Sequence, residues 1–268
     1  MLEMLSIIGY LSSVVIGVSL GLIGGGGSIL TVPVLVYMFH ENPVVSTSYS
    51  LFIVGVTSLL GAFPKFRNDL IDIRTAIVFG IPSILSVYAT RHFLLPAIPD
   101  PVFESDSVAL TKGGMMMLLF SVLMIASAIS MIRTPKVQRT PVPRSERNYN
   151  YPIILAEGLV VGALTGLVGA GGGFLIIPAL VLICGLPMKE AVGTSLLIIA
   201  AKSLIGFLGD AGQYQVNWTL LLTVTLAASG GIFIGNYLSG KINGEKLKNG
   251  FGWFVLITGL FIIYQEIK

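Results

Sequence analysis

Two stretches of this sequence decide its fold: GVSLGLIGGGGSILTVPVL at residues 17–35 and GALTGLVGAGGGFLIIPAL at residues 162–180. They align without a gap at an offset of 145 residues, and nine of nineteen positions are identical. The same register continues downstream and brings Gly61 over Gly206. A register kept over about forty-five residues indicates an internal duplication. The chain is therefore predicted to contain two copies of one unit.

The composition places both copies in a lipid bilayer. Hydrophobic residues make up 54% of the 268 residues and charged residues 11%, whereas a soluble domain carries about 25% charged residues. Long uncharged stretches cover Met4–Phe39, Val44–Pro64, Thr75–Thr90, Gly113–Ile132, Gly158–Met188, Ala211–Gly240 and Gly250–Gln265, and Ala191–Gly209 is interrupted only by Lys202. Backbone polar groups in lipid must be satisfied within the segment, and these stretches lack the alternation of barrel strands. The fold class is therefore an all-α polytopic membrane protein with roughly eight to ten embedded segments.

The glycine tracts mark the points where two of these stretches must break. As one helix, Met4–Phe39 would be roughly 54 Å long, against a hydrocarbon core of about 30 Å. The first break is predicted at Gly24, Gly25, Gly26 and Gly27, and the second at Gly169, Gly171, Gly172 and Gly173. Each repeat is thus expected to hold four helices and a short segment that follows the break.

A basic segment divides the chain. Residues 133–150, RTPKVQRTPVPRSERNYN, contain three prolines and five basic residues but one acidic residue. Prolines favour a linker, and the excess of Lys and Arg favours the cytoplasmic side. The predicted organisation is a first membrane repeat at 1–132, a cytoplasmic basic linker at 133–150 and a second membrane repeat at 151–268.

Loop charges favour an inverted second copy. The loop Lys65–Arg74 has a net charge of +1 and its counterpart around Asp210 of −1, while Arg91–Lys112 has −1 and Lys241–Lys248 has +2. Opposite charges on equivalent loops are expected when one copy is upside down. Inversion needs an odd number of crossings, which is met if the short segments Ser28–His40 and Phe174–Gly185 count as crossings. The alternative is eight helices in two parallel groups of four.

The doubled motif resembles the sulfite exporter TauE/SafE family. The residues that carry the resemblance are GLIGGGGSILTVPVL (21–35), GLVGAGGGFLIIPAL (166–180) and AVGTSL (191–196), while the first copy departs from the last motif with STSYSL (46–51). The resemblance implies a transporter of small anions, typically sulfite, sulfonates or related organosulfur compounds, in the bacterial inner (cytoplasmic) membrane. It does not specify the solute.

Helix breaks suit an anion because N–H groups at a new helix N-terminus lack partners and the helix dipole favours negative charge. Ser28 is a candidate cap for the first short helix. Hydroxyls that follow the breaks can donate to anion oxygens, while the pairs Gly17/Gly21, Gly162/Gly166 and Gly231/Gly235 are better explained by helix packing. The predicted substrate-binding residues are Gly24, Gly25, Gly26, Gly27, Ser28, Ser50, Gly169, Gly171, Gly172, Gly173, Thr194, Ser195 and Lys202.

Charged residues within the apolar stretches are the most specific candidates for a functional role. Lys202 lies in a predicted helix, at the repeat position of Thr57, and a lysine in lipid usually marks a pathway. Its alternative roles are an internal pair or a position at the membrane interface. Glu157 is a weaker candidate for proton coupling, and Asp210, which ends a helix, is interpreted as a solvated loop charge.

Other classes of function are less well supported. No nucleotide-binding loop, zinc-protease or nucleophile-elbow motif is present, so no catalytic residue, cofactor or metal site is expected. The expected partners are a small anionic solute and the lipid bilayer, with no nucleic acid and a homo-oligomer left open. The leading function is a secondary carrier or facilitator. The alternatives are an intramembrane enzyme and an assembly factor without its own solute.

Overall fold

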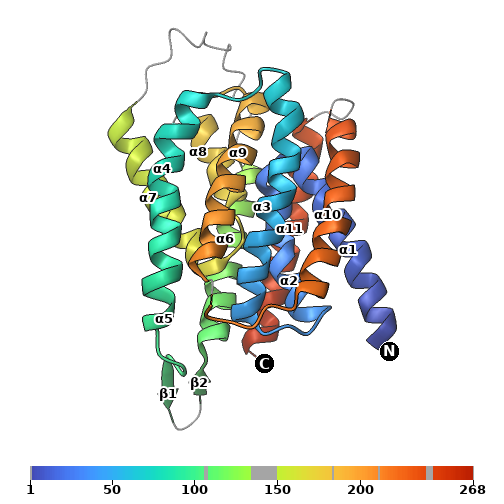
Figure 1. Cartoon of the computed structure of the whole chain (residues 1–268), viewed down its shortest axis with the longest axis vertical. Coiled ribbons are helices and arrows are strands. Elements are labelled where there is room, and N and C mark those ends of the chain that lie inside the picture. The colour runs from blue at the N-terminus through green and yellow to red at the C-terminus, as the bar shows by residue number, and fades with distance from the viewer. Residues whose placement is uncertain are drawn as a thin grey trace.

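The chain forms a bundle of long helices, seen in a computed structural model (Figure 1). The structure describes residues 2–105, 108–133, 150–182, 184–210, 212–239 and 244–267. The helices of the first half are α1 (Leu2–Ile23), the three-ten helix η1 (Gly25–Leu30), α2 (Thr31–Tyr37), α3 (Pro43–Arg67), α4 (Ile73–Ala89), the π-helical turn η2 (Thr90–Leu94), α5 (Leu95–Ala97) and α6 (Lys112–Arg133). Those of the second half are α7 (Tyr151–Val168), α8 (Gly173–Leu182), α9 (Met188–Gly209), α10 (Trp218–Ser239) and α11 (Gly244–Ile267).

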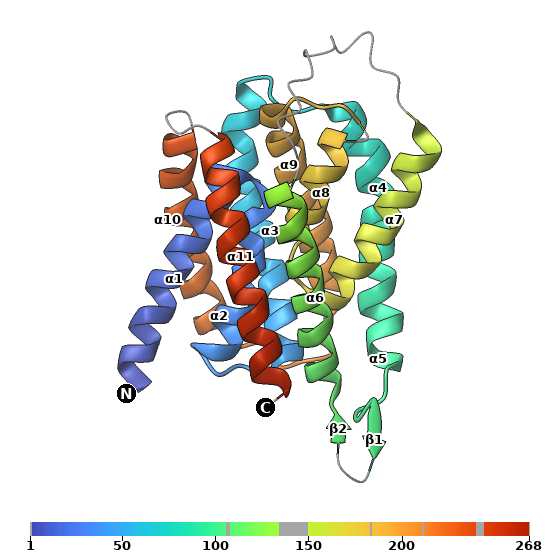
Figure 2. The same cartoon turned by 180° about the vertical axis from the view of Figure 1, so that it is seen from behind.

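Both ends of the bundle can be followed in the figures. The N- and C-termini lie at the same end, which we call the termini end (Figures 1 and 2). Arg133, the last residue of α6, and Tyr151, the first of α7, lie at the opposite end, which we call the linker end. The predicted linker itself, and the basic residues around Lys241, lie almost wholly outside the described residues.

Each glycine break turns the chain back along the helix before it. The ring centroids of Tyr10, near the start of α1, and Phe39, just after α2, lie 5.2 Å apart. The short segment α2 therefore returns toward the end at which α1 began. In the same way α8 runs back along α7 toward the linker end (Figure 2). Each short segment therefore forms a hairpin with the helix before it.

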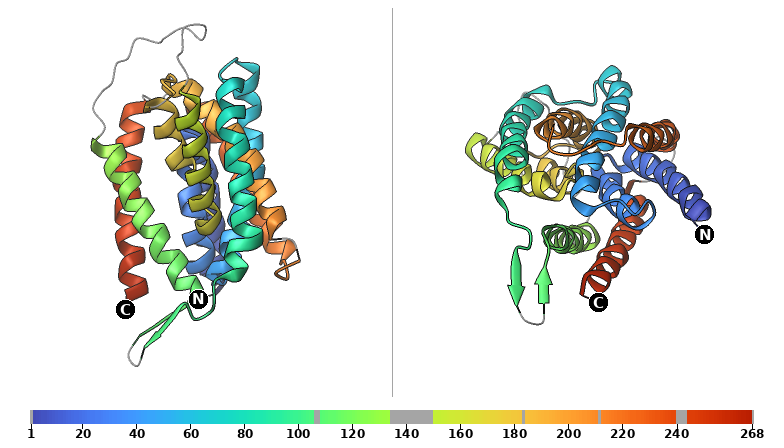
Figure 3. Two further views of the ribbon diagram at one scale, coloured as in Figure 1. Left: turned by 90° about the vertical axis from the view of Figure 1, so that its left-hand side faces the viewer. Right: turned by 60° about the horizontal axis from the view of Figure 1, so that its bottom comes forward.

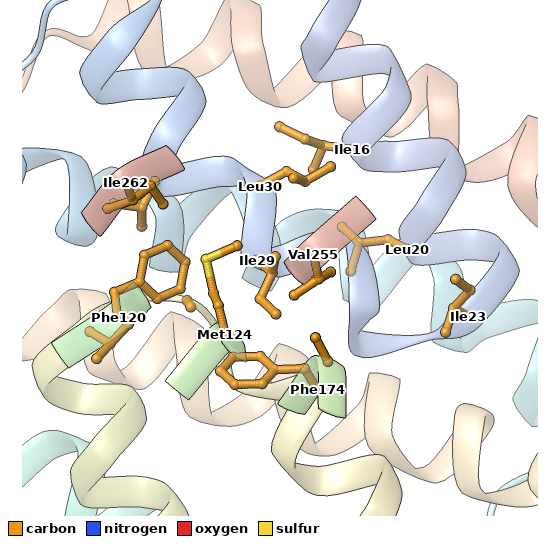
Figure 4. Close-up of a cluster of buried hydrophobic side chains, with 14 of the residues drawn as sticks. Ile16, Leu20, Ile23, Ile29, Leu30, Phe120, Met124, Phe174, Val255 and Ile262 are labelled. Carbon is orange, nitrogen blue, oxygen red and sulfur yellow. The ribbon is translucent and has the colours of Figure 1, made fainter. Parts of the chain in front are cut away.

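Helices from the two halves pack against each other throughout the bundle. Helix α3 contacts α9, α1 contacts α10, α4 contacts α7 and α9, and α6 contacts α11. A buried apolar cluster joins Ile16, Ile29, Met124, Phe174 and Val255 from both halves (Figure 4). The bundle core is therefore shared rather than divided into two separate units.

The predicted membrane character is confirmed. Six helices of the described part are long and apolar enough to cross a bilayer: α3, α4 with its continuation to Ala97, α6, α7, α9 and α10. Their outward faces carry large apolar side chains such as Leu226, Phe63 and Leu85, which are 71%, 63% and 64% exposed. An apolar surface of this kind is stable in contact with lipid.

The loop between η2 and α6 contains an element that the sequence did not predict. Strands β1 (Phe103–Ser105) and β2 (Val108–Leu110) pair antiparallel in a small hairpin beyond the termini end of the bundle (Figure 3). Helices α3 and α4 begin at residues whose side chains cap them. Asn42 accepts a hydrogen bond from the Val44 amide before α3, and Asp72 does so from the Thr75 amide before α4.

Candidate functional site

The first glycine break is a change of helix type. Helix α1 ends at Ile23, and Gly24 has a φ of +80°, a conformation that glycine adopts without strain. The chain continues as the three-ten helix η1. The Ser28 hydroxyl donates to the Gly25 carbonyl at 2.7 Å instead of accepting from a backbone amide. The predicted cap at Ser28 is therefore wrong, and this hydroxyl satisfies a carbonyl within the break.

The second break is a left-handed loop. Gly169 ends α7 in the left-handed conformation, and Gly171 and Gly172 follow with φ of +64° and +70°. The amides of Leu175 and Ile176 then donate to the Gly172 carbonyl at 3.0 and 3.1 Å, which starts α8. The amides before them belong to a first helical turn, which has no intrahelical acceptors.

The two breaks meet inside the bundle. A Cβ atom added at Gly25 would collide with the backbone of Gly173, and the reverse also holds. A Cβ at Gly171 would lie 3.4 Å from the Ser28 side chain. Packing of backbone against backbone therefore explains why these glycines are needed. Any solute must bind beside this contact or separate it.

Lys202 is the charged group that reaches the second break. It is fully buried, and its ammonium donates to the Thr165 hydroxyl on α7 at 3.0 Å. A Cβ at Gly172 would lie 2.8 Å from the Lys202 nitrogen, so the ammonium lies directly against the loop that starts α8. Within the described residues, no carboxylate oxygen is found within 4.0 Å of this nitrogen. The cation thus has a neutral hydroxyl as its partner.

The hydroxyl groups predicted to bind the substrate make different contacts in the structure. Ser195 lies beside Gly24, where its oxygen would be 3.1 Å from an added Cβ, and it donates to the Val192 carbonyl at 2.9 Å. Ser50 is fully buried, and its hydroxyl has no partner in the described part of the chain. Thr194 accepts a hydrogen bond from the Asp72 amide at 2.9 Å. Its oxygen therefore holds a loop between helices.

Tyr49, where the first copy departs from the AVGTSL motif, has a role similar to that of Thr194 in the second copy. Tyr49 occupies the position equivalent to Thr194 at the offset of 145 residues. Its hydroxyl accepts from the amide of Asn217, the residue equivalent to Asp72. Asn217 in turn caps α10 by accepting from the Leu220 amide, just as Asp72 caps α4. Both halves use a side-chain hydroxyl to hold the start of their next helix.

An ion pair between Arg91 and Asp210 was not predicted. The Arg91 Nη1 lies 3.1 Å from Asp210 Oδ2, and both side chains are almost completely buried. Burial raises the pKa of Asp210, while the charge of Arg91 opposes that rise. The interpretation of Asp210 as a solvated loop charge is wrong. Arg91 and Asp210 each follow the last residue of an uncharged stretch. Because α4 packs against α9, the ends of these two stretches lie close together.

Glu157 lies apart from this group. It is half-buried in α7, and its Oε2 has no hydrogen-bond partner among the described residues. Eight residues separate it from Thr165, which corresponds to about 12 Å along a helix. Glu157 and Lys202 therefore do not form one site.

A cluster of metal-ligating side chains is also absent from the described residues.

Together, the apolar helices, the shared core and the broken segments with a buried charge define a multi-pass membrane protein of the transporter class. The sulfite exporter TauE/SafE family matches residues 10–262, and the chain belongs to this family.

Relatives of similar length carry the description "probable membrane transporter protein". One from Xylella fastidiosa (strain Temecula1) is 28% identical over 258 residues, which cover 94% of this chain and 92% of the relative. YunE of Bacillus subtilis is 27% identical, covering 92% and 93% of the two chains, and MJ0441 of Methanocaldococcus jannaschii is 25% identical, covering 98% and 96%. No solved structure matches the chain.

Proposed function

We propose that this protein carries a small oxyanion, either sulfite or a related sulfonate or organosulfur anion, across the cytoplasmic membrane. The observation that carries the proposal is Lys202. Its ammonium is fully buried, lies against the loop that starts α8 and contacts the neutral Thr165 hydroxyl.

A counter-ion stabilises the charged form of a buried lysine. Moving an unpaired ammonium out of water costs several kcal/mol, and an anion beside it recovers much of that cost. The start of α8 adds backbone amides and the positive end of a helix dipole. An anion between Lys202, Thr165 and the first turn of α8 would satisfy all three groups. The glycines of the second break would allow its oxygens to approach the backbone closely.

The two halves are proposed to form an inverted repeat, which supports a carrier mechanism. Helix α1 starts at the termini end and its counterpart α7 at the linker end (Figure 2). At the offset of 145 residues, α1, α3 and α4 correspond to α7, α9 and α10. Helix α1 contacts α10, and the corresponding pair α7 and α4 is also in contact. Likewise α3 contacts α10, and the corresponding pair α9 and α4 is in contact. In such folds, movement of one repeat against the other exposes a central site to each side in turn.

The linker end is proposed to face the cytoplasm. Helix α3 ends with Arg67 and α4 begins just before Arg74, and these helix ends lie at the linker end (Figure 1). Lys and Arg are enriched in short cytoplasmic loops. The termini end, with the Arg91–Asp210 pair, would then face the outside.

Catalysis is the less favoured function. An intramembrane enzyme needs an acid–base pair at one site, but Lys202 contacts Thr165 while Glu157 lies about 12 Å further along α7. Glu157 remains a proposed carrier of a coupling proton, because its Oε2 lacks a partner in the described part of the structure. An assembly factor has no need for a buried lysine beside a helix start.

The test is uptake into proteoliposomes that contain the purified protein. Sulfite, thiosulfate, taurine, sulfoacetate and a simple carboxylate are each supplied outside, and initial rates are measured against concentration. Saturable uptake of at least one sulfur oxyanion is expected. Lys202→Met should lower kcat/KM for that anion by about tenfold or more, because it removes a charged hydrogen-bonding partner.

Lys189→Met is the matched control, because Lys189 lies on the same helix but is exposed. It should transport as the wild type does. The proposal is wrong if none of these anions shows saturable flux, or if Lys202→Met has wild-type kinetics while it folds normally.

A further inference from the structure

Arg91 has more hydrogen-bonding capacity than its partners use. Its side chain is fully buried, and only Nη1 has partners, the Asp210 carboxylate at 3.1 Å and the Thr47 hydroxyl at 3.0 Å. Nε and Nη2 of Arg91, and Oδ1 of Asp210, have no partner in the part of the chain that the structure describes. Buried groups of this kind are costly when unsatisfied and usually require an explanation.

The position of Arg91 is fixed by the elements around it. It lies in the π-helical turn η2, and such turns are frequent at functional sites. The Gln213 amide holds the turn by donating to the Gly209 carbonyl at 2.9 Å and the Arg91 carbonyl at 3.4 Å. Gln213 thus holds the backbone of Arg91, while Asp210 and Thr47 hold its guanidinium and orient the free N–H groups.

Arg91 and Lys202 flank the same loop. Arg91 contacts Thr47, and Thr47 packs directly against Gly169, the first residue of the second break. Lys202 lies against another residue of this loop, Gly172. On α9, Gly206 and Gly209 lie between Lys202 and Asp210, and they face Val87 and Arg91. Lys202 and Asp210, the partner of Arg91, are thus separated by about two turns of α9, or roughly 12 Å along its axis.

We infer that Arg91 forms a second anion-binding site, at the termini end, and that Asp210 is the counter-ion that an arriving oxyanion displaces. This inference rests on the proposed function, and it adds a place where the solute binds before it reaches Lys202. A guanidinium binds oxyanions through a planar pair of N–H donors. Asp210 uses one oxygen on one nitrogen, so a sulfur oxyanion with three oxygens satisfies donors that Asp210 leaves free.

A purely structural ion pair makes a different prediction from an exchangeable one. If the pair only holds α4 to α9, then removing either charge weakens the fold and changes anion binding little. If the anion competes with Asp210, then the two removals have opposite effects on affinity. The sign of the change therefore distinguishes the two roles.

The experiment compares Asp210→Asn with Arg91→Gln in the proteoliposome assay, with thiosulfate and sulfite as probes supplied on the side of the termini end. Asp210→Asn removes the competitor and should lower KM by about tenfold, while Arg91→Gln should raise KM by about tenfold, since each tenfold step corresponds to about 1.4 kcal/mol. Arg67→Gln is the control, because Arg67 is exposed at the opposite end. It should leave KM unchanged.

Folding is monitored by size-exclusion chromatography in detergent. If Arg91→Gln does not fold, Arg91→Lys replaces it, and the loss of the planar donor pair should still raise KM several-fold. The inference is overturned if folded Asp210→Asn keeps KM within twofold of wild type, or raises it. Absence of flux in the wild-type protein would instead contradict the proposed function, so the two failures are distinguishable.

Discussion

The two glycine breaks occupy equivalent positions in the two halves, but only the second has a charge beside it. Lys202 lies against the second break, whereas the equivalent Thr57 donates its hydroxyl to the Ile53 carbonyl of its own helix. The ends of the bundle differ in the same way. The termini end has Arg91 and Asp210, and the equivalent positions at the linker end are Asn236 and Lys65. The glycine breaks recur in both halves of the sequence, whereas Lys202, Arg91 and Asp210 have no like-charged residue at the equivalent position.

This comparison distinguishes residues that are needed for packing from residues that form the candidate site. Backbone contacts such as Gly25 against Gly173 need glycine in both halves, because neither residue has room for a side chain. Charged groups in lipid are costly, so they are placed only where a partner or a solute uses them. We therefore expect substitutions in the backbone contact to disturb both breaks, and substitutions of charged residues to act on the site that contains them.

The largest effect is expected at the contact of the two breaks. Gly173→Ala and Gly25→Ala should each abolish most folded protein, since the added methyl group collides with backbone that cannot move independently, at a cost of about 4 kcal/mol or more. The yield of monodisperse protein in detergent measures this. Gly230→Ala is the control, because a Cβ there meets no atom within 4 Å. Normal yield of either variant would show that the breaks are not tightly packed.

The next effect concerns the ion pair. Arg91→Met should destabilise the protein by about 3–5 kcal/mol, because it leaves the Asp210 carboxylate buried without its partner. The double variant Arg91→Met, Asp210→Leu should recover most of that loss, since both desolvated charges are then removed. Apparent unfolding temperatures of the four combinations give the coupling energy. Additive losses would show that the two side chains do not act as a pair.

The features that could be predicted from the sequence are those that depend on residues close together in the chain. Uncharged stretches predicted the membrane helices, and the excessive length of Met4–Phe39 predicted a break at Gly24. The direction of the chain after each break could not be predicted, because a left-handed glycine permits a reversal without requiring one.

The candidate site was predicted less completely, because it depends on contacts between distant segments. Lys202 was identified from its cost in lipid, but its partner Thr165 comes from another helix. Arg91 and Asp210 are separated by 119 residues and lie at the ends of their apolar runs, where charges are usually solvated. Their burial follows from the packing of α4 against α9, which no local pattern indicates.

A smaller effect is expected from the matched hydroxyls at Tyr49 and Thr194. Thr194→Val should lower stability by about 1–3 kcal/mol, because the buried Asp72 amide loses its acceptor. Tyr49→Phe should cost less, since Asn217 is exposed and water can replace the lost hydroxyl. Thermal unfolding in detergent measures both. If Thr194→Val weakened anion binding without lowering stability, Thr194 would belong to the solute site as the sequence predicted.

The smallest effect is expected at Asn236, and it should have the opposite sign from that at Arg91. The side-chain nitrogen and oxygen of Asn236 are buried without hydrogen-bond partners among the described residues. Replacing an unsatisfied amide by an apolar group removes a desolvation cost. Asn236→Leu should therefore stabilise the protein by up to about 1 kcal/mol, seen as a rise of about 2 °C in apparent unfolding temperature. A decrease would show that the amide makes an interaction at the linker end, and the two ends of the bundle would then be more alike than their charges indicate.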